Sequence, residues 1–324
     1  MEWRSSSPNE LRPVDRADAD RHYAADWDTG TSPHRQKDTD MQDYIFTLEC
    51  AERHGITHAV TGALLTHGGD IKELKQFDDQ STQQLFLRID FSVSDEPGNG
   101  VEALRTDFEA IGEEFGATWQ LWPQGQKRRV LIMVSKFEHC LNDLLFRARV
   151  GELPIEIAAV VSNHPDHREL VEWHHIPFFR IPVTKETKPE AEAKLLELVD
   201  RFEVDLVVLA RYMQILSDDL ARELTGRAIN IHHSFLPSFK GAKPYHQAWE
   251  RGVKTVGATA HFVNSELDEG PIIAQQLVEV DHAFTPEDLV AAGRDAECKA
   301  LSNAVKWHCD GRVFLSGKRT VVLR

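Results

Sequence analysis

Three side chains in the C-terminal half of the chain could act together on a carbonyl carbon: Asn230, His232 and Asp268. An asparagine amide can donate to a developing oxyanion, a histidine transfers protons near neutral pH, and an aspartate can orient an imidazole or position a water. Asn230 and His232 are two residues apart, so on an extended segment both side chains leave the same face. Asp268 lies 36 residues after His232, so only the tertiary fold can bring it close.

Each residue type also has an ordinary structural interpretation. A lone histidine is more often a core residue hydrogen-bonded to a carbonyl, and an asparagine at a strand end often bridges backbone groups. An aspartate before Gly-Pro commonly opens a turn, and for Asp268 this is compatible with a chemical role. The adjacent Glu269 is expected to point elsewhere. The residue types alone leave these alternatives open.

Two separated motifs favour the chemical interpretation. Residues 230–238 read Asn-Ile-His-His-Ser-Phe-Leu-Pro-Ser, and residues 267–271 read Leu-Asp-Glu-Gly-Pro. Together they resemble the signature of the folate-dependent formyltransferases, in which Asn-x-His and Ser-x-Leu-Pro precede a Leu-Asp-x-Gly-Pro turn. The resemblance extends over about residues 41–324 and does not include residues 1–40.

The resemblance implies a role for each residue of these motifs. Asn230 would donate to the formyl oxygen, His232 would be the catalytic histidine, and Asp268 would orient the imidazole and the attacking water. His233 would be structural. The resemblance also favours a cis bond before Pro237, against a base rate of about 5–6% for X–Pro bonds, and the isomer stays open.

A second group of residues is implied to hold the folate. After a predicted strand, the Arg-Tyr-Met-Gln-Ile-Leu loop would surround the pterin ring, with backbone groups at the ring edge and apolar side chains as walls. The ordinary alternative is a helix start with core aliphatic residues. The residues implied to contact the folate are Arg211, Tyr212, Met213, Gln214, Ile215, Leu216, Val263, Asn264 and Leu267.

The resemblance is strongest to the hydrolytic members of the family. It implies an enzyme of one-carbon metabolism, which supplies purine biosynthesis. This enzyme would hydrolyse 10-formyltetrahydrofolate to tetrahydrofolate and formate with no cofactor and no metal. Two alternatives remain: formyl transfer to an amine acceptor such as glycinamide ribonucleotide, and a non-catalytic sensor of folate or an amino acid. A sensor need not keep all three of Asn230, His232 and Asp268.

The turn of residues 135–140 argues against a phosphorylated acceptor. It reads Ser-Lys-Phe-Glu-His-Cys and contains no glycine, whereas a Gly-rich turn lets backbone N–H groups surround a phosphate. This departs from glycinamide ribonucleotide formyltransferase, and it also argues against a dinucleotide site. Lys136 and His139 could hold a small anion or be solvated. Phe137 and Glu138 are expected to crowd or repel an acceptor.

Composition and charge exclude several other classes. The net charge of −15 argues against a nucleic-acid surface, although a local pocket can still bind an anion. The four cysteines are scattered, which is typical of free thiols in a reducing compartment. No metal-ligand spacing is present. No apolar run is long enough to span a bilayer or to form a signal peptide, so a cytoplasmic location is expected.

The pattern of elements predicts a tail and two domains. Residues 1–40 are rich in Ser, Asp, Arg and Pro and are expected to be disordered. Residues 41–124 predict a βαββαβ order, a small ferredoxin-like unit that resembles an ACT domain. The resemblance implies that this unit regulates or assembles a homo-oligomer and could bind an amino-acid effector.

The remaining residues, 129–324, predict a Rossmann-type α/β domain of the formyltransferase kind with a mostly parallel sheet. Apolar strands alternate with amphipathic helices, and a short strand over residues 228–231 carries the first motif. Further strands over residues 258–263 and 272–280 flank the Asp268 turn. Ligands of such sheets bind at the carboxyl ends of the strands, and both halves of the motif are expected there.

Overall fold

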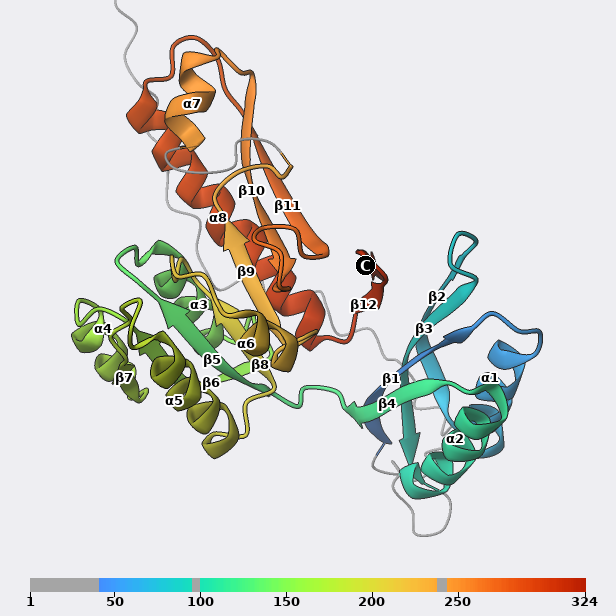
Figure 1. The fold of residues 1–324 in the computed structure, drawn as a ribbon. Coiled ribbons are helices and arrows are strands. Elements are labelled where there is room, and N and C mark those ends of the chain that lie inside the picture. Colours follow the sequence, from blue (N-terminus) through green and yellow to red (C-terminus); the bar gives the residue numbers. More distant parts are fainter. Residues whose placement is uncertain (1–40, 95–99, 238–243) are drawn as a thin grey trace, which may run out of the picture. The chain divides into compact units, whose positions relative to one another are not determined.

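The computed structural model describes residues 41–94, 100–237 and 244–324. The predicted disordered tail, residues 1–40, lies outside the described residues. The described residues build a four-stranded sheet, a seven-stranded sheet and a two-stranded hairpin (Figure 1). None of the helices in these ranges is long and apolar enough to cross a membrane.

The four-stranded sheet is formed by the predicted βαββαβ segment. Its elements are β1 (Met41–Ala51), α1 (Ile56–Thr66), β2 (Asp70–Asp79), β3 (Gln84–Ser94), α2 (Val101–Phe115) and β4 (Thr118–Pro123). The strands lie in the order β2-β3-β1-β4, and each neighbouring pair is antiparallel. The structure confirms the predicted small antiparallel-sheet domain, which is compatible with an ACT-like fold.

Both helices of this unit bury an apolar stripe in one core. Val60 and Leu64 of α1, and Leu104 and Phe108 of α2, are spaced four residues apart and are almost fully buried. They pack against Phe46 of β1, whose ring centroid lies 4.1 Å from that of Phe108. This core contains no clustered acid–base groups, so it is built for stability of the unit.

The seven-stranded sheet and its helices follow. The elements are β5 (Arg128–Val134), α3 (His139–Arg149), β6 (Ile155–Ser162), α4 (Arg168–Trp173), β7 (Phe178–Arg180), α5 (Lys188–Arg201), β8 (Leu206–Leu209), α6 (Asp218–Glu223), β9 (Ala228–His232), α7 (Pro244–Glu250), β10 (Thr255–Phe262), β11 (Ile272–Glu279) and α8 (Pro286–Cys309). The hairpin is formed by β12 (Val313–Ser316) and β13 (Arg319–Val322). The strand order is β11-β10-β9-β8-β5-β6-β7, and the mostly parallel formyltransferase-like sheet is confirmed.

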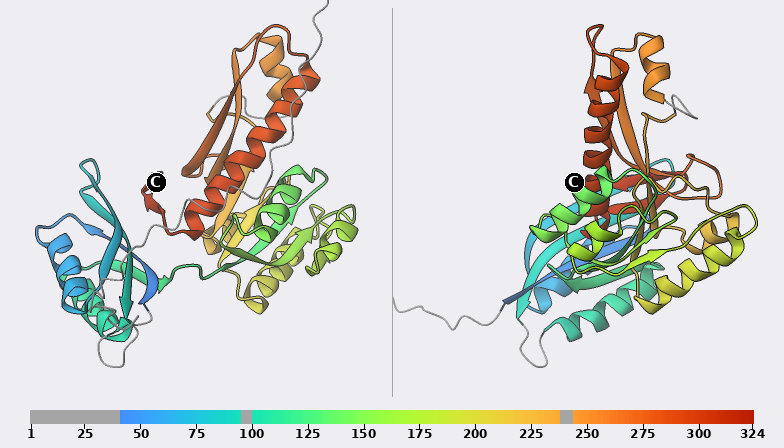
Figure 2. Two further views of the ribbon diagram at one scale, coloured as in Figure 1. Left: turned by 180° about the vertical axis from the view of Figure 1, so that it is seen from behind. Right: turned by 90° about the vertical axis from the view of Figure 1, so that its left-hand side faces the viewer.

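The central strand β5 explains why its sequence is an uninterrupted apolar run. Val130, Ile132 and Val134 are buried on one face with residues of α3 and α8, and Leu131 and Met133 are buried on the other with α5 and α6. A strand covered on both faces cannot alternate with polar residues. The long helix α8 lies along β10 and β11 (Figures 1 and 2).

One expectation about the sheet is wrong. The run that precedes the Asp268 turn forms β10, and β10 pairs antiparallel with both β9 and β11. The end of β10 therefore lies beside the start of β9, and Asp268 does not follow the carboxyl end of a parallel strand. The short elements α4, β7, α6 and α7 were also not predicted, since their segments are too short for a clear period.

Candidate active site

The strand β9 carries the first half of the site. Asn230 pairs with Leu209 of β8 on one side and with His261 of β10 on the other. His232 is the last residue of the strand and is 5% exposed. As expected from their spacing, Asn230 and His232 leave β9 on the same face.

The loop after β10 returns Asp268 to this strand. The backbone N–H of Phe262 donates to the carbonyl of Pro271 (2.9 Å), which closes the loop over the end of β10. Gly270 is required there, because a Cβ atom at this position would lie 1.7 Å from the carbonyl oxygen of Phe262. Asp268 itself has φ 58°, a left-handed conformation that Asp tolerates better than most residues. The Asp-x-Gly-Pro part of the motif thus forms this tight turn.

The return places Asp268 against His232. The distance from Nδ1 of His232 to Oδ1 of Asp268 is 3.1 Å. Burial alone would raise the pKa of the Asp268 carboxyl, but the hydrogen bond and charge of His232 bring this pKa below its ordinary value. The carboxylate therefore orients the imidazole through Nδ1. The other ring nitrogen, Nε2, is buried and has no hydrogen-bond partner among the described residues, so the fold itself does not use it.

His261 is a member of the site that the sequence did not reveal. Its Nδ1 lies 2.8 Å from the carbonyl oxygen of Phe262, which can only accept, so this nitrogen carries the proton. Burial lowers the pKa of His261, and its Nε2 then accepts from the Asn230 amide at 3.2 Å. This bond fixes which way the amide points and leaves its second N–H for a ligand.

Side chains of β10 and β11 hold the turn that follows His232 through hydrogen bonds to its backbone. The hydroxyl of Thr259 donates to the carbonyl of Ser234 (2.9 Å) and accepts from the backbone N–H of Leu236 (3.0 Å). The Leu236–Pro237 peptide bond is cis, which settles the isomer that the sequence left open. His233 is half-buried, and burial lowers its pKa to about 4, so it is neutral at pH 7.

These residues share one pocket with the predicted folate contacts. The pocket has a volume of ≈ 270 Å³ and contains Asn230, His232 and Asp268. Every residue predicted to contact the folate also lines it, namely Arg211, Tyr212, Met213, Gln214, Ile215, Leu216, Val263, Asn264 and Leu267. Met213, Ile215 and Leu267 expose more than half of their side chains, which is unusual for large apolar residues and suits a flat ring between two walls.

A second cluster of charged groups adjoins the pocket. Glu297 of α8 is 1% exposed and bonds His139 Nε2 (2.8 Å) and the Tyr245 hydroxyl (3.1 Å). Arg211 reaches the same carboxylate, with Nε 3.4 Å from Oε2. The ligand atoms of His139, Cys140 and Glu297 lie within 4.8 Å of one another, a spacing that could hold a metal ion. No local pattern indicated this cluster, because Glu297 lies 157 residues after Cys140.

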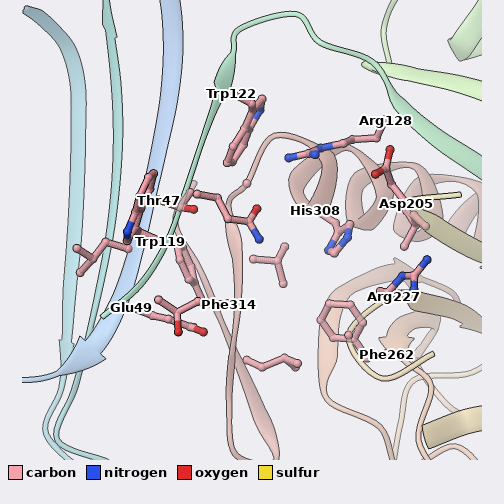
Figure 3. Close-up of a pocket in the computed structure, with 18 of the residues that line it drawn as sticks. Thr47, Glu49, Trp119, Trp122, Arg128, Asp205, Arg227, Phe262, His308 and Phe314 are labelled. Carbon is pink, nitrogen blue, oxygen red and sulfur yellow. The ribbon is translucent and has the colours of Figure 1, made fainter. Parts of the chain in front are cut away.

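Another hollow lies away from these groups (Figure 3). Its volume is ≈ 460 Å³, and residues of β1 and β4 contribute to its wall. The guanidinium carbon of Arg128 lies 4.6 Å from the ring centroid of Trp122 at its edge, and Asp205 and His308 also line it. Asn230, His232 and Asp268 do not line this hollow, so it is separate from the candidate active site.

Comparisons with known proteins agree with this geometry. Residues 128–305 match the family model described as formyl transferase. Formyltetrahydrofolate deformylase of a Corynebacterium species is 68% identical over 281 residues, which are 87% of this chain and 98% of the relative. The crystal structure of formyltetrahydrofolate deformylase from Burkholderia mallei has a TM-score of 0.84 at 50% identity and covers 87% of this chain and 100% of that chain.

A transferase structure is similar over a smaller part of the chain. The crystal structure of glycinamide ribonucleotide transformylase 1 from Symbiobacterium toebii has a TM-score of 0.58 at 32% identity and covers 63% of this chain and 98% of that chain. The deformylase relatives, in contrast, match nearly all of the described residues and are covered almost completely. The chain therefore belongs to the formyl transferase family and, within it, to the formyltetrahydrofolate deformylases.

Proposed function

We propose that this protein hydrolyses 10-formyltetrahydrofolate to tetrahydrofolate and formate, and that Asn230, His232 and Asp268 carry out the reaction. One observation supports this most strongly. A His232–Asp268 pair with a free Nε2 lies in the same pocket as an amide whose direction is fixed by His261. An oriented imidazole beside an oriented amide donor is the arrangement that acyl transfer to water requires.

The reaction can be written with these groups alone. Water adds to the formyl carbon while the carboxylate of Asp268 orients it. The amide N–H of Asn230 and the Nε2–H of protonated His232 stabilise the oxyanion. The carbon–N10 bond then breaks, its electron pair stays on N10, and N10 takes a proton. Formate leaves, and one proton is released to solvent because formic acid is ionised at neutral pH.

We propose that the folate ring binds between two walls of the pocket. The loop over Tyr212–Leu216 and the loop over Val263–Leu267 lie on two sides of the pocket, and their exposed apolar side chains would cover the two faces of the pterin. Met213 has φ 56° and Arg211 φ 65°, so this loop is bent sharply at two places. The carbonyl of Arg211 accepts from the backbone N–H of Ser135 (3.2 Å), and the carbonyl of Tyr212 contacts the Ser135 hydroxyl, so we expect the backbone of residues 213–216 to read the ring edge.

Water, not an amine, is the acceptor in this proposal. In the turn after β5 the side chain of Ser135 is buried and donates to the side chain of Asn163 (2.7 Å), so it is not free for a phosphate. Phe137 of the same turn lies over the guanidinium of Arg211, 5.1 Å from ring centroid to Cζ. The ring therefore occupies the position beside Arg211 in this turn, and we expect it to hinder an acceptor larger than water.

The test is formate release from 10-formyltetrahydrofolate by the purified full-length protein with no amine present. We expect formate and tetrahydrofolate in equal amounts, at a rate that added glycinamide ribonucleotide does not change. Faster formylation of an added amine than formate release would replace hydrolysis with transfer. Folate binding with neither product would identify a sensor.

We also propose that residues 41–124 form a separate regulatory or assembly domain that precedes the catalytic domain of residues 129–324. The antiparallel sheet of the first segment has a free edge at β2, and such edges commonly pair with a second copy. A homo-oligomer and an amino-acid effector are the expected consequences. Sedimentation of the full-length protein and of a fragment that begins at Arg129 tests the assembly role, and an unchanged oligomer in the fragment would contradict it.

A further inference from the structure

Arg211 lines the catalytic pocket, and its side chain reaches toward α3 and α8. The residue is 8% exposed, and its Cζ lies 5.1 Å from the ring centroid of Phe137. Its Nε lies 3.4 Å from Oε2 of Glu297 in α8. Arg211 is thus a buried cation in the wall of the catalytic pocket.

Two donors of the Arg211 guanidinium have no partner among the residues that the structure describes. Nε and Nη1 are both buried and neither has a hydrogen-bond partner. The contact of Nε with Glu297 is an ion pair without the geometry of a hydrogen bond. Buried donors are almost always paired, because an unpaired one has lost its water and gained nothing in return. These donors therefore indicate a reversibly bound ligand that accepts hydrogen bonds.

Glu297 is not that acceptor in this structure, because Nε and Nη1 of Arg211 make no hydrogen bond with its carboxylate, which bonds other groups. Its Oε2 bonds Nε2 of His139 at 2.8 Å, and its Oε1 bonds the hydroxyl of Tyr245 at 3.1 Å. Burial raises the pKa of Glu297, but the hydrogen bond from His139 and the charge of Arg211 bring it below the ordinary value. The carboxylate is thus a fixed counter-charge that holds Arg211 in the pocket wall.

We propose that Arg211 forms a binding subsite for formate, the carboxylate product, on the side of the pocket that faces α3 and α8. This inference rests on the proposed hydrolysis. A carboxylate matches a guanidinium in shape and charge, and the two form parallel N–H···O bonds. The buried Nε2 of His232 lines the same pocket and is also without a partner.

The surroundings favour the smallest carboxylate. Phe137 covers one side of the guanidinium, with its ring centroid 5.1 Å from Cζ, and leaves less room for a larger carboxylate. A neutral formyl group makes no ion pair with Arg211. Once the carbon–N10 bond has broken, the product is an anion that does. Arg211 thus attracts the one-carbon fragment once it is charged and holds it apart from the amine of tetrahydrofolate.

The experiment titrates sodium formate in two ways. Binding of carbon-13 formate is followed by NMR line width on the full-length protein saturated with tetrahydrofolate, which needs no turnover. Inhibition of deformylation by sodium formate is measured in parallel, with sodium chloride at equal ionic strength. We expect Arg211→Met to weaken both by about 10-fold or more, the value of one charge-assisted hydrogen bond, and Arg211→Lys to weaken them less.

Controls separate the subsite from folding and from the proposed function. Arg222→Met removes an arginine whose side chain is 71% exposed, and formate binding should be unchanged. If Arg211→Met does not fold, the double variant Arg211→Met with Glu297→Gln is used in its place, because it removes both charges of the pair. Sodium acetate should bind more weakly than formate.

Equal formate binding by the wild type and Arg211→Met overturns the subsite, as does absence of formate binding by the wild type. Arg211-dependent formate binding without hydrolysis of 10-formyltetrahydrofolate supports the subsite and rejects the proposed function.

Discussion

Two buried arginines in this protein differ in what surrounds them. Arg88 lies in β3 of the four-stranded sheet and is 1% exposed. Its Nε donates to the carbonyl of Asp310 (2.9 Å), its Nη1 to Glu73 (3.0 Å), and its Nη2 lies 3.0 Å from Asp90. Arg211 in the catalytic pocket is about as deeply buried, but its Nε and Nη1 have no hydrogen-bond partner.

The difference distinguishes a structural cation from one poised for a ligand. Arg88 stabilises the fold because its Nε and Nη1 donate to protein oxygens and its Nη2 lies beside the carboxylate of Asp90, which would lose its charge partner if Arg88 were removed. Arg211 is kept in place by a single counter-charge, Glu297, and keeps donors free. In the catalytic pocket, Arg211 and His232 both have buried nitrogens without a hydrogen-bond partner among the described residues, and His232 is held by Asp268.

The largest effect is expected at that pair. Replacing His232 by Ala, or Asp268 by Asn, should lower the turnover of 10-formyltetrahydrofolate by about 10²-fold or more, because a general acid–base group or its orienting partner is lost. Tetrahydrofolate binding should survive, since the ring is held by other loops. Steady-state rates and equilibrium binding measure the two quantities. Glu269→Gln is the matched control and should retain nearly full turnover; a loss equal to that of Asp268→Asn would assign the carboxylate to the wrong residue.

Arg88→Met sharpens the comparison of the arginines. It should lower the free energy of unfolding by about 3 kcal/mol, because the buried carboxylate of Asp90 loses its partner, whereas Glu73 keeps Arg312. Chemical denaturation measures this change. Formate inhibition of the folded variant should stay at the wild-type level. Arg211→Met should do the opposite, with a clear loss of formate inhibition and a smaller change in stability. If both variants lose stability equally and neither affects formate, the distinction between the two arginines is wrong.

A smaller effect is expected from the residue that holds the oxyanion donor. His261→Phe removes the acceptor of the Asn230 amide and should lower kcat by about 10-fold, because a misdirected donor no longer meets the oxyanion. The KM should change little. His261→Gln keeps an acceptor and should recover part of the rate. A loss that appears in KM and not in kcat would mean that His261 shapes the folate pocket instead.

The smallest effect concerns stability and pH outside the catalytic pocket. Burial lowers the pKa of His308 to about 4 from the ordinary 6.5, and its Nδ1 is buried without a partner. Between these values the unfolded chain binds a proton that the folded chain does not, so stability is lost as pH falls from about 6.5 toward 4. His308 should contribute about 1 kcal/mol to the difference between pH 7.5 and pH 5.5. Denaturation of His308→Gln at both values should show a shallower pH dependence than the wild type.

Local sequence patterns were sufficient for most of the elements. The apolar run of β5 indicated a strand buried on both faces, and the spacing of apolar residues in α5 indicated a helix on a sheet. The same is true of the βαββαβ order before residue 124. Periodicity reports burial along one element, so it succeeds where an element is long. It failed for α4, α6 and α7, which span only six or seven residues each.

The site divides in the same way. The sequence determined the residue types, the shared face of Asn230 and His232, and the tight turn at Gly270 that a side chain could not occupy. Only the tertiary structure decided which groups meet. The antiparallel entry of β10 sets His261 opposite Asn230.

The path of α8 likewise brings Glu297 into contact with Arg211, although the two residues lie far apart in the sequence. Strand order and direction are set by the competition of whole elements for one core, and no local spacing encodes that outcome.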